Sequence, residues 1–437
     1  MFFACGMQQR RLMVLVVTAL AALLVSGCGG DGASQEEQDS AEDTATTSED
    51  TEQATTTTAD TGQAPEDALT AALDQSFAES GAPGVVAAVQ TPDYTWIRAL
   101  GVADRTSEEP MTPDVYHRIG SVNKTFTGTL LLQAEAEGLL SLDDTIDRYV
   151  DGVPNGDKIT LRQMADHTSG VADYSRTEQF DDELASDPYQ VWEPEQLVQI
   201  GLKDSPLFDP GTEWQYSNTN YILLGLVLEQ VTGETIGQLY RERIIEPLGL
   251  QDTSFPDLAD SSLPDPHAQG YTLKGQSSGG EPLDTTDWNF SWAWTAGEMI
   301  STVEDLLAYG RALGTGEGLF SPEQQAERLD SFIRDLPPFN QPPLNGDAGY
   351  GIGLTYDRGW IGHGGEIDGY NTQLFYHPEL DAVVAVAVNS DISSGDCPED
   401  RPTMEEGPHD VPCAGPADRI FRALAEALGR PAPAPAQ

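Results

Sequence analysis

The pattern of apolar and polar residues predicts strands near both ends of the chain and helices between them. Short apolar runs bounded by turn residues predict strands at 84–90, 94–104, 350–357, 369–378 and 382–390. Apolar residues at helical spacing predict terminal helices at 65–80 and 417–428. Between them the same spacing predicts helices at 125–140, 160–166, 220–233, 235–245 and 302–313.

This order of elements predicts an α+β fold. Strands from both ends can join one antiparallel sheet, and the two terminal helices can then pack on it. We therefore expect an α/β sandwich: a central antiparallel β-sheet flanked by the N- and C-terminal helices, with an all-helical lobe inserted at about 120–314. The folded domain is expected to span residues 65–430.

The N-terminal segment predicts export. A basic start precedes an apolar run from Leu12 to Val25, which is short for a membrane span and typical of a signal peptide over residues 1–27. The sequence "VSGC" resembles a bacterial lipoprotein signal, in which Cys28 is lipidated and anchors the exported protein to the cell membrane. An ordinary cleaved signal with an incidental cysteine is the alternative.

The ends of the chain predict disorder. Residues 28–64 are rich in Thr, Glu, Asp and Ala and cannot bury enough apolar surface to fold, so we expect an acidic tether. Residues 431–437 form a Pro/Ala-rich tail. Beyond the leader only Cys397 and Cys413 remain for pairing besides Cys28, and in an oxidising compartment they predict a disulfide.

Charge narrows the range of partners. The formal net charge is -50, with 72 acidic against 22 Lys and Arg residues. Such a surface repels nucleic acid and does not attract anionic lipid headgroups, so the lipid anchor would be the membrane contact. We interpret the charge as a solvated acidic shell rather than as an acid-specific function.

One of the four lysines lies in an unusually apolar part of the sequence. Lys158, Lys203 and Lys274 have polar neighbours in the sequence, where a lysine stays solvated, whereas Lys124 begins an apolar helix. No Asp or Glu occurs from Val115 to Ala134, and a nearby carboxylate would keep Lys124 charged.

Ser121 lies one helical turn before that lysine. Residues three apart share a helix face, so the amine and the hydroxyl are expected side by side. A buried, neutral amine can take a proton from serine, and the free N–H groups of the helix N-terminus can stabilise an oxyanion. The pair therefore predicts a nucleophile with its base; a capping serine with a surface lysine is the alternative.

Two later motifs add to the pair. Tyr216 and Asn218 stand just before an apolar helix, where a phenol with a depressed pKa could relay protons and an amide could orient an amine and a substrate carbonyl. The alternatives are a packing tyrosine and a helix-capping asparagine. His363 is followed by Gly364 and Gly365 in a strand-like segment, where glycine marks a close approach of backbone or ligand, or else a bulge.

In this order the three motifs resemble those of the penicillin-recognising serine hydrolases, in the branch of class C β-lactamases, D-alanyl-D-alanine carboxypeptidases, D-aminopeptidases and related esterases. The resemblance runs from about Pro65 to Ser390 and includes "LRQMADHTSGVADY" and "AGEMISTVEDLLAY". It implies a β-lactamase/transpeptidase-like fold.

The same resemblance assigns roles to the motif residues. Ser121 is the acylated nucleophile, Lys124 its base and Tyr216 the acid/base for the leaving group. Asn218 is a partner of substrate and lysine, and His363, Gly364 and Gly365 form the third motif on the edge of the cleft. The backbone N–H groups of Ser121 and Glu366 form the oxyanion hole.

The third motif departs from the family pattern. Carboxypeptidases of this branch usually have threonines where this chain has Gly364 and Glu366, and the hydroxyls of those threonines hold the substrate carboxylate. Recognition of a carboxylate is therefore in doubt, and Arg358 is the first cation to consider for that task.

Other signals compete less well. "GQSSG" at 275–279 matches the elbow of α/β-hydrolases but lies in a polar loop, and "HTSG" at 167–170 fits the C-terminal turn of a helix. The histidines lack metal-ligand spacing and no nucleotide motif is present, so no cofactor or metal is expected. Three tryptophans are expected at the rim of the cleft, with simple packing as the alternative: Trp288, Trp292 and Trp294.

Together these features predict an exported, lipid-anchored serine hydrolase that forms an acyl-enzyme on Ser121. The expected substrate is a small molecule or peptide with an amide, such as a D-amino-acid peptide of the cell wall, or a β-lactam. A small-molecule carboxylesterase is the close alternative. A penicillin-binding sensor or scaffold that turns over slowly is an alternative of a different class.

Overall fold

The computed structural model describes residues 63–339, 347–398, 401–404 and 410–432. The predicted signal peptide, the lipidation site Cys28, most of the tether and residues 433–437 lie outside this part of the chain. The first helix, α1 (Gln63–Ser80), begins two residues before the expected start of the folded domain at residue 65. Among the described residues, no helix has the length and apolar character needed to cross a membrane.

Strands from the two ends of the chain form one sheet, which confirms the predicted α+β fold. The order of its eight strands is β3-β2-β1-β12-β11-β10-β9-β8, and all neighbours are antiparallel. The strands are β1 (Gly84–Gln90), β2 (Thr95–Asp104), β3 (Glu109–Pro110), β8 (Ala348–Tyr350), β9 (Thr355–Asp357), β10 (Trp360–Ile367), β11 (Tyr370–His377) and β12 (Ala382–Val388).

The centre of this sheet is buried on both faces. Successive side chains of a strand point to opposite faces, so a strand that is covered on both sides is apolar throughout. Val85 and Val386 belong to a core cluster with α1 and the last helix, α11 (Pro416–Ala427), whereas Val86 and Ala385 belong to the larger cluster on the other face. The uninterrupted apolar sequences of β1 and β12 follow from this double burial.

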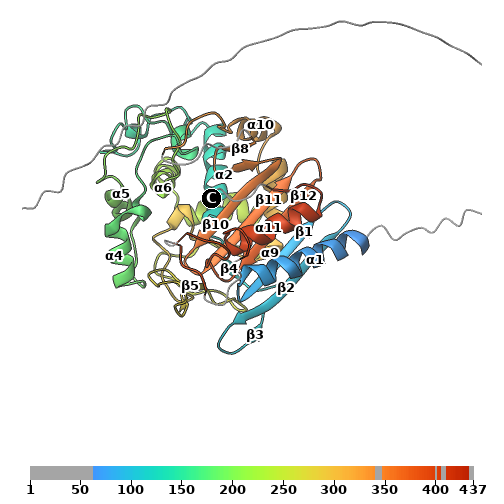
Figure 1. Ribbon diagram of the computed structural model, residues 1–437. Coiled ribbons are helices and arrows are strands. Elements are labelled where there is room, and N and C mark those ends of the chain that lie inside the picture. Colours follow the sequence, from blue (N-terminus) through green and yellow to red (C-terminus); the bar gives the residue numbers. More distant parts are fainter. Residues whose placement is uncertain (1–62, 340–346, 399–400, 405–409, 433–437) are drawn as a thin grey trace, which may run out of the picture. The chain divides into compact units, whose positions relative to one another are not determined.

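Helices cover both faces of the sheet (Figure 1). α1 and α11 pack against each other, and α11 also packs on β11 and β12. α9 (Val303–Thr315) packs on β1, β11 and β12, and its buried Leu306 and Leu307 belong to the larger cluster on the face opposite α1 and α11. The sequence places α9 in the inserted lobe at 120–314, because its periodicity predicts an amphipathic helix but does not say which surface covers the apolar side.

The inserted segment supplies most of the remaining helices. α2 (Asn123–Ala136) contacts both β10 and α6 (Asn218–Thr232), so it joins the sheet to the lobe. The other helices are α3 (Leu161–Ala165), α4 (Glu178–Ser186), α5 (Pro194–Gly201), α7 (Ile236–Tyr240), α8 (Glu246–Leu248) and α10 (Pro322–Asp330). Two further pairs of short strands form: β4 (His117–Arg118) pairs with β7 (Ile300–Ser301), and β5 (Tyr271–Thr272) pairs with β6 (Leu283–Asp284).

Some expected elements differ in detail. The segment 350–357, expected to be one strand, forms the end of β8, a turn and β9, and Gly353 in the turn has a φ of 67°. A side chain on Gly353 would also collide with the Lys124 carbonyl oxygen, so this turn needs glycine for close packing on α2 as well as for its backbone angle.

Candidate active site

The Ser121 hydroxyl lies at the N-terminal end of α2. A 3₁₀ turn, Gly120–Val122, leads directly into α2, and Ser121 remains partly exposed while the helix that follows is buried. Gly120 has a φ of 52°, in the left-handed region that glycine adopts without strain. The turn thus places Ser121 in the wall of the cleft and directs the apolar helix into the interior.

Lys124 lies one turn further and points back to the serine. Its Nζ is 2.9 Å from Ser121 Oγ and donates a hydrogen bond to the Ala296 carbonyl oxygen at 2.6 Å. The side chain is fully buried. Burial lowers the lysine pKa to about 7, although Asp173 acts in the opposite direction. The amine can therefore be neutral near pH 7 and accept the serine proton.

The acid-free stretch around Lys124 has a broader cause than we expected. Eleven of the fourteen residues of α2 are buried, so carboxylates are absent before Glu135 because this part of the helix crosses the interior. A carboxylate nevertheless approaches from elsewhere, since Asp173 precedes the turn 174–176 and raises the Lys124 pKa as the smaller of two effects. Desolvation exceeds that attraction, so the pKa falls.

Tyr216 approaches the same hydroxyl from the segment before α6. Its hydroxyl donates to Ser121 Oγ at 2.9 Å, and the Lys124 ammonium nitrogen is 4.9 Å from the centre of its ring. Burial raises the Tyr216 pKa well above 10, so the depressed phenol pKa that we expected is wrong. The phenol keeps its proton near neutral pH and acts as a donor, while Lys124 is the group that titrates near pH 7.

His167, from the "HTSG" sequence, supports Tyr216 from behind. It directly follows α3, as expected for a C-terminal turn, but it is completely buried. Its Nδ1 accepts the backbone N–H of Ser217 at 3.2 Å, and its ring centre is 4.3 Å from that of Tyr216. Burial keeps the His167 pKa well below 6.5, so the ring is a neutral acceptor. The sequence signal was present, but only the fold shows that it serves Tyr216.

Asn218 is the first residue of α6 and lines the cleft beside Ser121. Its Nδ2 donates to Ser175 Oγ at 2.9 Å and lies 3.5 Å from the Asp173 carboxylate. The expected pairing of Asn218 with Lys124 is absent from the hydrogen bonds of the described residues. The amide is instead held by the loop before α4, with its oxygen left for other contacts.

The third motif lies against the serine turn. A methyl group on Gly365 would collide with the Ile119 carbonyl oxygen and would lie 3.3 Å from the Ser121 nitrogen. A methyl group on Gly120 would lie 2.9 Å from the Glu366 nitrogen. β10 and the serine turn therefore approach too closely for side chains, and the backbone amides of Ser121 and Glu366 become neighbours. This is the arrangement that an oxyanion hole requires.

His363 and Gly364 lie further along the same strand. His363 Nε2 is 2.9 Å from the Tyr350 hydroxyl, and burial lowers the His363 pKa to about 3, so the ring is neutral at working pH. Both residues line a cavity of about 440 Å³ that also includes Ser121 and Tyr216. Gly364 leaves this wall open, because a methyl group there would meet only the flexible amide of Gln373.

Trp294 does not line the cleft, which corrects our expectation. It is 3% exposed, and a methyl group on Gly225 of α6 would collide with its ring, so it packs in the core. Trp292 lines a second cavity beside Ser121, of about 190 Å³, together with Tyr174 and Phe180. Trp288 is partly buried and packs on the core.

Two cations line the cleft that the sequence did not indicate. Lys274 lines the smaller cavity and is 3.4 Å from Asp368, so its polar sequence neighbours were misleading. Arg176 lines the larger cavity, 3.7 Å from Asp173. Arg358 is exposed and belongs to neither cavity lining.

The competing elbow sequence does not form an elbow. Residues 275–279 lie in an exposed loop after the two-residue strand β5, with no helix after them, and Ser277 is exposed. The structure therefore provides no strand-to-helix turn that would activate Ser277.

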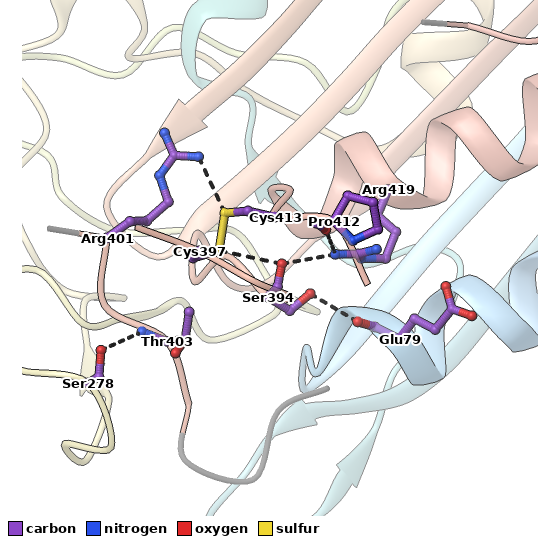
Figure 2. The surroundings of a disulfide bond; sticks show 9 residues. All are labelled: Glu79, Ser278, Ser394, Cys397, Arg401, Thr403, Pro412, Cys413 and Arg419. Carbon is purple, nitrogen blue, oxygen red and sulfur yellow. Dashed lines mark hydrogen bonds between the residues drawn. A yellow bond between two sulfur atoms is a disulfide. The ribbon is translucent and has the colours of Figure 1, made fainter. Parts of the chain in front are cut away.

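A disulfide joins Cys397 to Cys413 and closes a loop of the chain (Figure 2). Arg401 within this loop lies 4.0 Å from Cys413 Sγ, and it is one of the charges that act on Glu366. The Thr403 N–H donates to Ser278 Oγ at 3.3 Å, so the loop also contacts the segment that follows Lys274.

The chemistry available at this site is nucleophilic. Ser121 has a base and a proton donor within hydrogen-bond distance and two backbone amides beside it. Within the described part of the chain, no group of three or more His, Cys, Asp or Glu side chains is arranged to hold a metal ion. The arrangement fits acyl transfer through a serine ester.

Comparison with known proteins agrees with this geometry. A model of the Beta-lactamase family matches residues 42–407. A D-stereospecific amidohydrolase from a Streptomyces species is 34% identical, with 75% of this chain and 94% of that chain covered and a TM-score of 0.67. A D-amino acid amidase from Ochrobactrum anthropi SV3 is 25% identical, with 84% of this chain and 98% of that chain covered and a TM-score of 0.68.

A D-aminopeptidase from Cereibacter sphaeroides is 28% identical over 75% of this chain. The match covers 61% of that aminopeptidase, so the chain spans about three fifths of the length of this curated relative.

Proposed function

The chain belongs to the β-lactamase family, and on that basis we propose that it is an exported serine hydrolase that cleaves small amides through an acyl-enzyme on Ser121. The observation that carries this proposal is the pair of contacts at one oxygen. Lys124 Nζ and the Tyr216 hydroxyl each lie 2.9 Å from Ser121 Oγ. A base and an acid are thus both in reach of the nucleophile.

Acylation follows from the protonation states. Neutral Lys124 takes the Ser121 proton while Oγ forms a bond to the substrate carbonyl carbon. The oxyanion is stabilised by the N–H groups of Ser121 and Glu366. As the carbon–nitrogen bond breaks, Tyr216 gives its proton to the leaving nitrogen, and the proton held by Lys124 replaces it. Water then attacks the ester, which releases the acid and restores the serine.

The substrate class is inferred from the family and the site together. Relatives bear the names D-aminopeptidase and D-amino acid amidase, and both names denote cleavage of amides. We propose amides of the same kind for this chain, namely D-amino-acid peptides or amides such as those of the cell wall, or β-lactams. The set of nucleophile, base and proton donor accounts for acylation, and steady-state assays distinguish turnover from binding alone.

Export and anchoring rest on the N-terminal sequence. We propose that residues 1–27 direct export and that Cys28 carries the lipid. Metabolic labelling with radioactive palmitate checks this: the wild type should be labelled and Cys28→Ala should not. Label on both proteins would contradict the anchor site.

A covalent probe tests the nucleophile. A fluorescent fluorophosphonate should label the wild type and Ser277→Ala equally, and it should not label folded Ser121→Ala. Label that persists in Ser121→Ala would contradict the proposal.

An activity screen then tests the reaction. The screen uses D-amino-acid amides, D-Ala-D-Ala peptides, a chromogenic cephalosporin and p-nitrophenyl esters. We expect steady-state hydrolysis of at least one of the amides. A burst of acylation without turnover would indicate a sensor instead. Hydrolysis of esters alone would indicate an esterase.

A further inference from the structure

The smaller cavity beside Ser121 has a charged wall that the mechanism above does not use. Besides the aromatic side chains of Tyr174, Phe180 and Trp292, its lining includes three carboxylates and one ammonium group. The charged residues are Lys274, Glu366, Asp368 and Asp391. The proton donor Tyr216 lines the larger cavity instead, together with His363. The leaving group therefore belongs on the side of the larger cavity, and the smaller one is left for the acyl part of the substrate.

The carboxylates come from separate elements that meet at this wall. Glu366 lies on β10, Asp368 in the turn between β10 and β11, and Asp391 after β12. Burial raises the pKa of Asp368 and Asp391, and the charges of Asp368 and Glu366 further raise that of Asp391, whereas Glu366 itself is exposed. Desolvation and mutual repulsion favour the protonated carboxyl groups, so a cation bound among them would stabilise their ionised forms.

Asp368 is the most buried of the three, with 8% of its surface exposed. Its Oδ2 is 3.4 Å from Lys274 Nζ, whereas its Oδ1 has no hydrogen-bond partner among the described residues. Asp391 is already engaged, because one of its oxygens accepts the Thr272 hydroxyl at 2.8 Å. Asp368 therefore offers a free acceptor that burial holds in place, while the exposed Glu366 carboxylate makes no hydrogen bond among the described residues and can be a second contact.

The cavity already surrounds an ammonium group of this chain. Lys274 Nζ, besides its contact with Asp368, lies 5.8 Å from the ring centres of both Phe180 and Trp292. A carboxylate and two aromatic faces around one ammonium group are the combination that recognises cationic amines. The lysine side chain is 36% exposed, so it can move aside at little cost.

We propose that this cavity binds a protonated amine on the acyl part of the substrate, with Asp368 as its main contact. This inference rests on the proposed function and narrows it to amides or esters whose acyl group is cationic. The amine can be the α-amine of an N-terminal residue or a side-chain amine of the acylating residue. Lys274 occupies part of the site in the absence of substrate and competes with that amine.

The experiment compares matched chromogenic amides. D-phenylalanine p-nitroanilide should have a kcat/KM at least tenfold higher than its N-acetyl derivative, and Nα-acetyl-D-lysine p-nitroanilide shows whether a side-chain amine serves. In Asp368→Asn this ratio should fall at least fivefold, through a higher KM for the amine substrate. Lys274→Met should raise the ratio. As a matched control, Asp182→Asn, an exposed acid on α4, should keep the ratio within twofold.

The pH dependence of KM provides a second measurement, which a merely structural role of Asp368 would not change. The KM for D-phenylalanine p-nitroanilide should rise as its own amine deprotonates, near pH 7.7–8.0 for an α-amine, while the KM of the acetylated compound should not follow. The charged groups around Asp368 are Lys274, Glu366, Asp391 and Asp181, with Arg401 acting on Glu366. These groups are the same for both substrates, so the comparison cancels their titration.

The outcomes separate this inference from the function on which it rests. If N-acetyl-D-phenylalanine p-nitroanilide reacts as fast as the free amine, or if Asp368→Asn slows both equally, the amine site is wrong while the hydrolase stands. If no anilide is cleaved, the amine site is also wrong, and fluorophosphonate labelling of Ser121 then shows whether a hydrolase remains. Absence of both labelling and cleavage overturns the proposed function itself.

Discussion

Lys124 and Ser121 share a hydrogen bond of 2.9 Å, and the same lysine donates to the Ala296 carbonyl oxygen at 2.6 Å. A neutral amine satisfies both contacts, because it can donate one N–H to the carbonyl and accept the serine proton with its lone pair. A charged amine can only donate. The carbonyl thus orients the lone pair toward Ser121. Whether Lys124 can act as a base depends on the one proton that separates its charged form from its neutral form.

This proton sets the pH dependence of acylation. The Lys124 pKa is lowered to about 7, and only the deprotonated form is a base, so kcat/KM should rise with pH through about 7 and then level off. Two units below that value the rate should be roughly one hundredth of the plateau. A pH–rate profile measured with an uncharged ester, which does not titrate, checks this. A midpoint above pH 9 would show that Lys124 is not neutral in the free enzyme.

Replacing the lysine should remove the base while keeping the positive charge. Lys124→Arg should lose about 10²–10⁴-fold in kcat/KM, since a guanidinium group does not deprotonate at working pH. Lys203→Arg, on the surface, is the matched control and should be unaffected. Circular dichroism verifies that both variants are folded. Retained activity in Lys124→Arg would assign the base to another group.

The third motif offers a matched pair of glycines. Gly365→Ala should lower kcat/KM by about 10²-fold or more, because the new methyl group would push the serine turn away and displace the oxyanion-hole amides. Gly364→Ala adds the same group one residue earlier, where only the Gln373 amide must move, and should lose less than tenfold. Equal losses in the two variants would show that the close approach at Gly365 is not what matters.

The disulfide should contribute to stability. Cys397 and Cys413 are 16 residues apart, and closing a loop of that length restricts the unfolded chain by about 3 kcal/mol. Replacing both cysteines by serine should lower the free energy of unfolding in urea by up to about that amount, and reducing the wild type should have the same effect. An unchanged unfolding midpoint in the variant would contradict this.

The sequence indicated the elements that carry the chemistry because each has a local signal. Ser121, Lys124 and Tyr216 lie directly before or within strongly apolar helices, and His363 precedes two glycines in a strand. Strands β1 and β12 were predictable for the same reason, because each has a continuous apolar run as its local signal. The sequence did not indicate α4 and α10, because each is only nine residues long and mostly polar, so few apolar positions mark it.

What the sequence could not predict depends on contacts between distant segments. Trp292 and Trp294 are two residues apart and share the same neighbouring sequence, yet Trp292 lines a cavity and Trp294 packs in the core. Lys274 and Arg176 reach the cleft only because their loops fold over it. The rise in the Tyr216 pKa has the same origin, since burial is a property of the folded chain.

A substrate whose leaving group ends in a free carboxylate should be disfavoured. Such an anion would lie in the larger cavity, beside the third motif. Gly364 offers it no hydrogen bond, and an ionised Glu366 would repel it. Arg176 is the cation in that lining, but it is 61% exposed and paired with Asp173 at 3.7 Å, so its attraction for an anion is weak. The net charge of -50 adds a long-range repulsion that salt screens.

We therefore expect a higher kcat/KM for neutral amides or esters than for matched substrates with a leaving-group carboxylate, and the gap should narrow as salt is raised. Replacing Gly364 and Glu366 together by threonine should shift the preference toward the carboxylate, because the two hydroxyls would supply the missing donors. A wild type that already prefers the carboxylate by tenfold, or about 1.4 kcal/mol, would contradict this interpretation. Arg176→Gln would then identify the anchor: loss of that preference would assign the carboxylate to Arg176, and an unchanged preference would leave the third motif itself as the binding group.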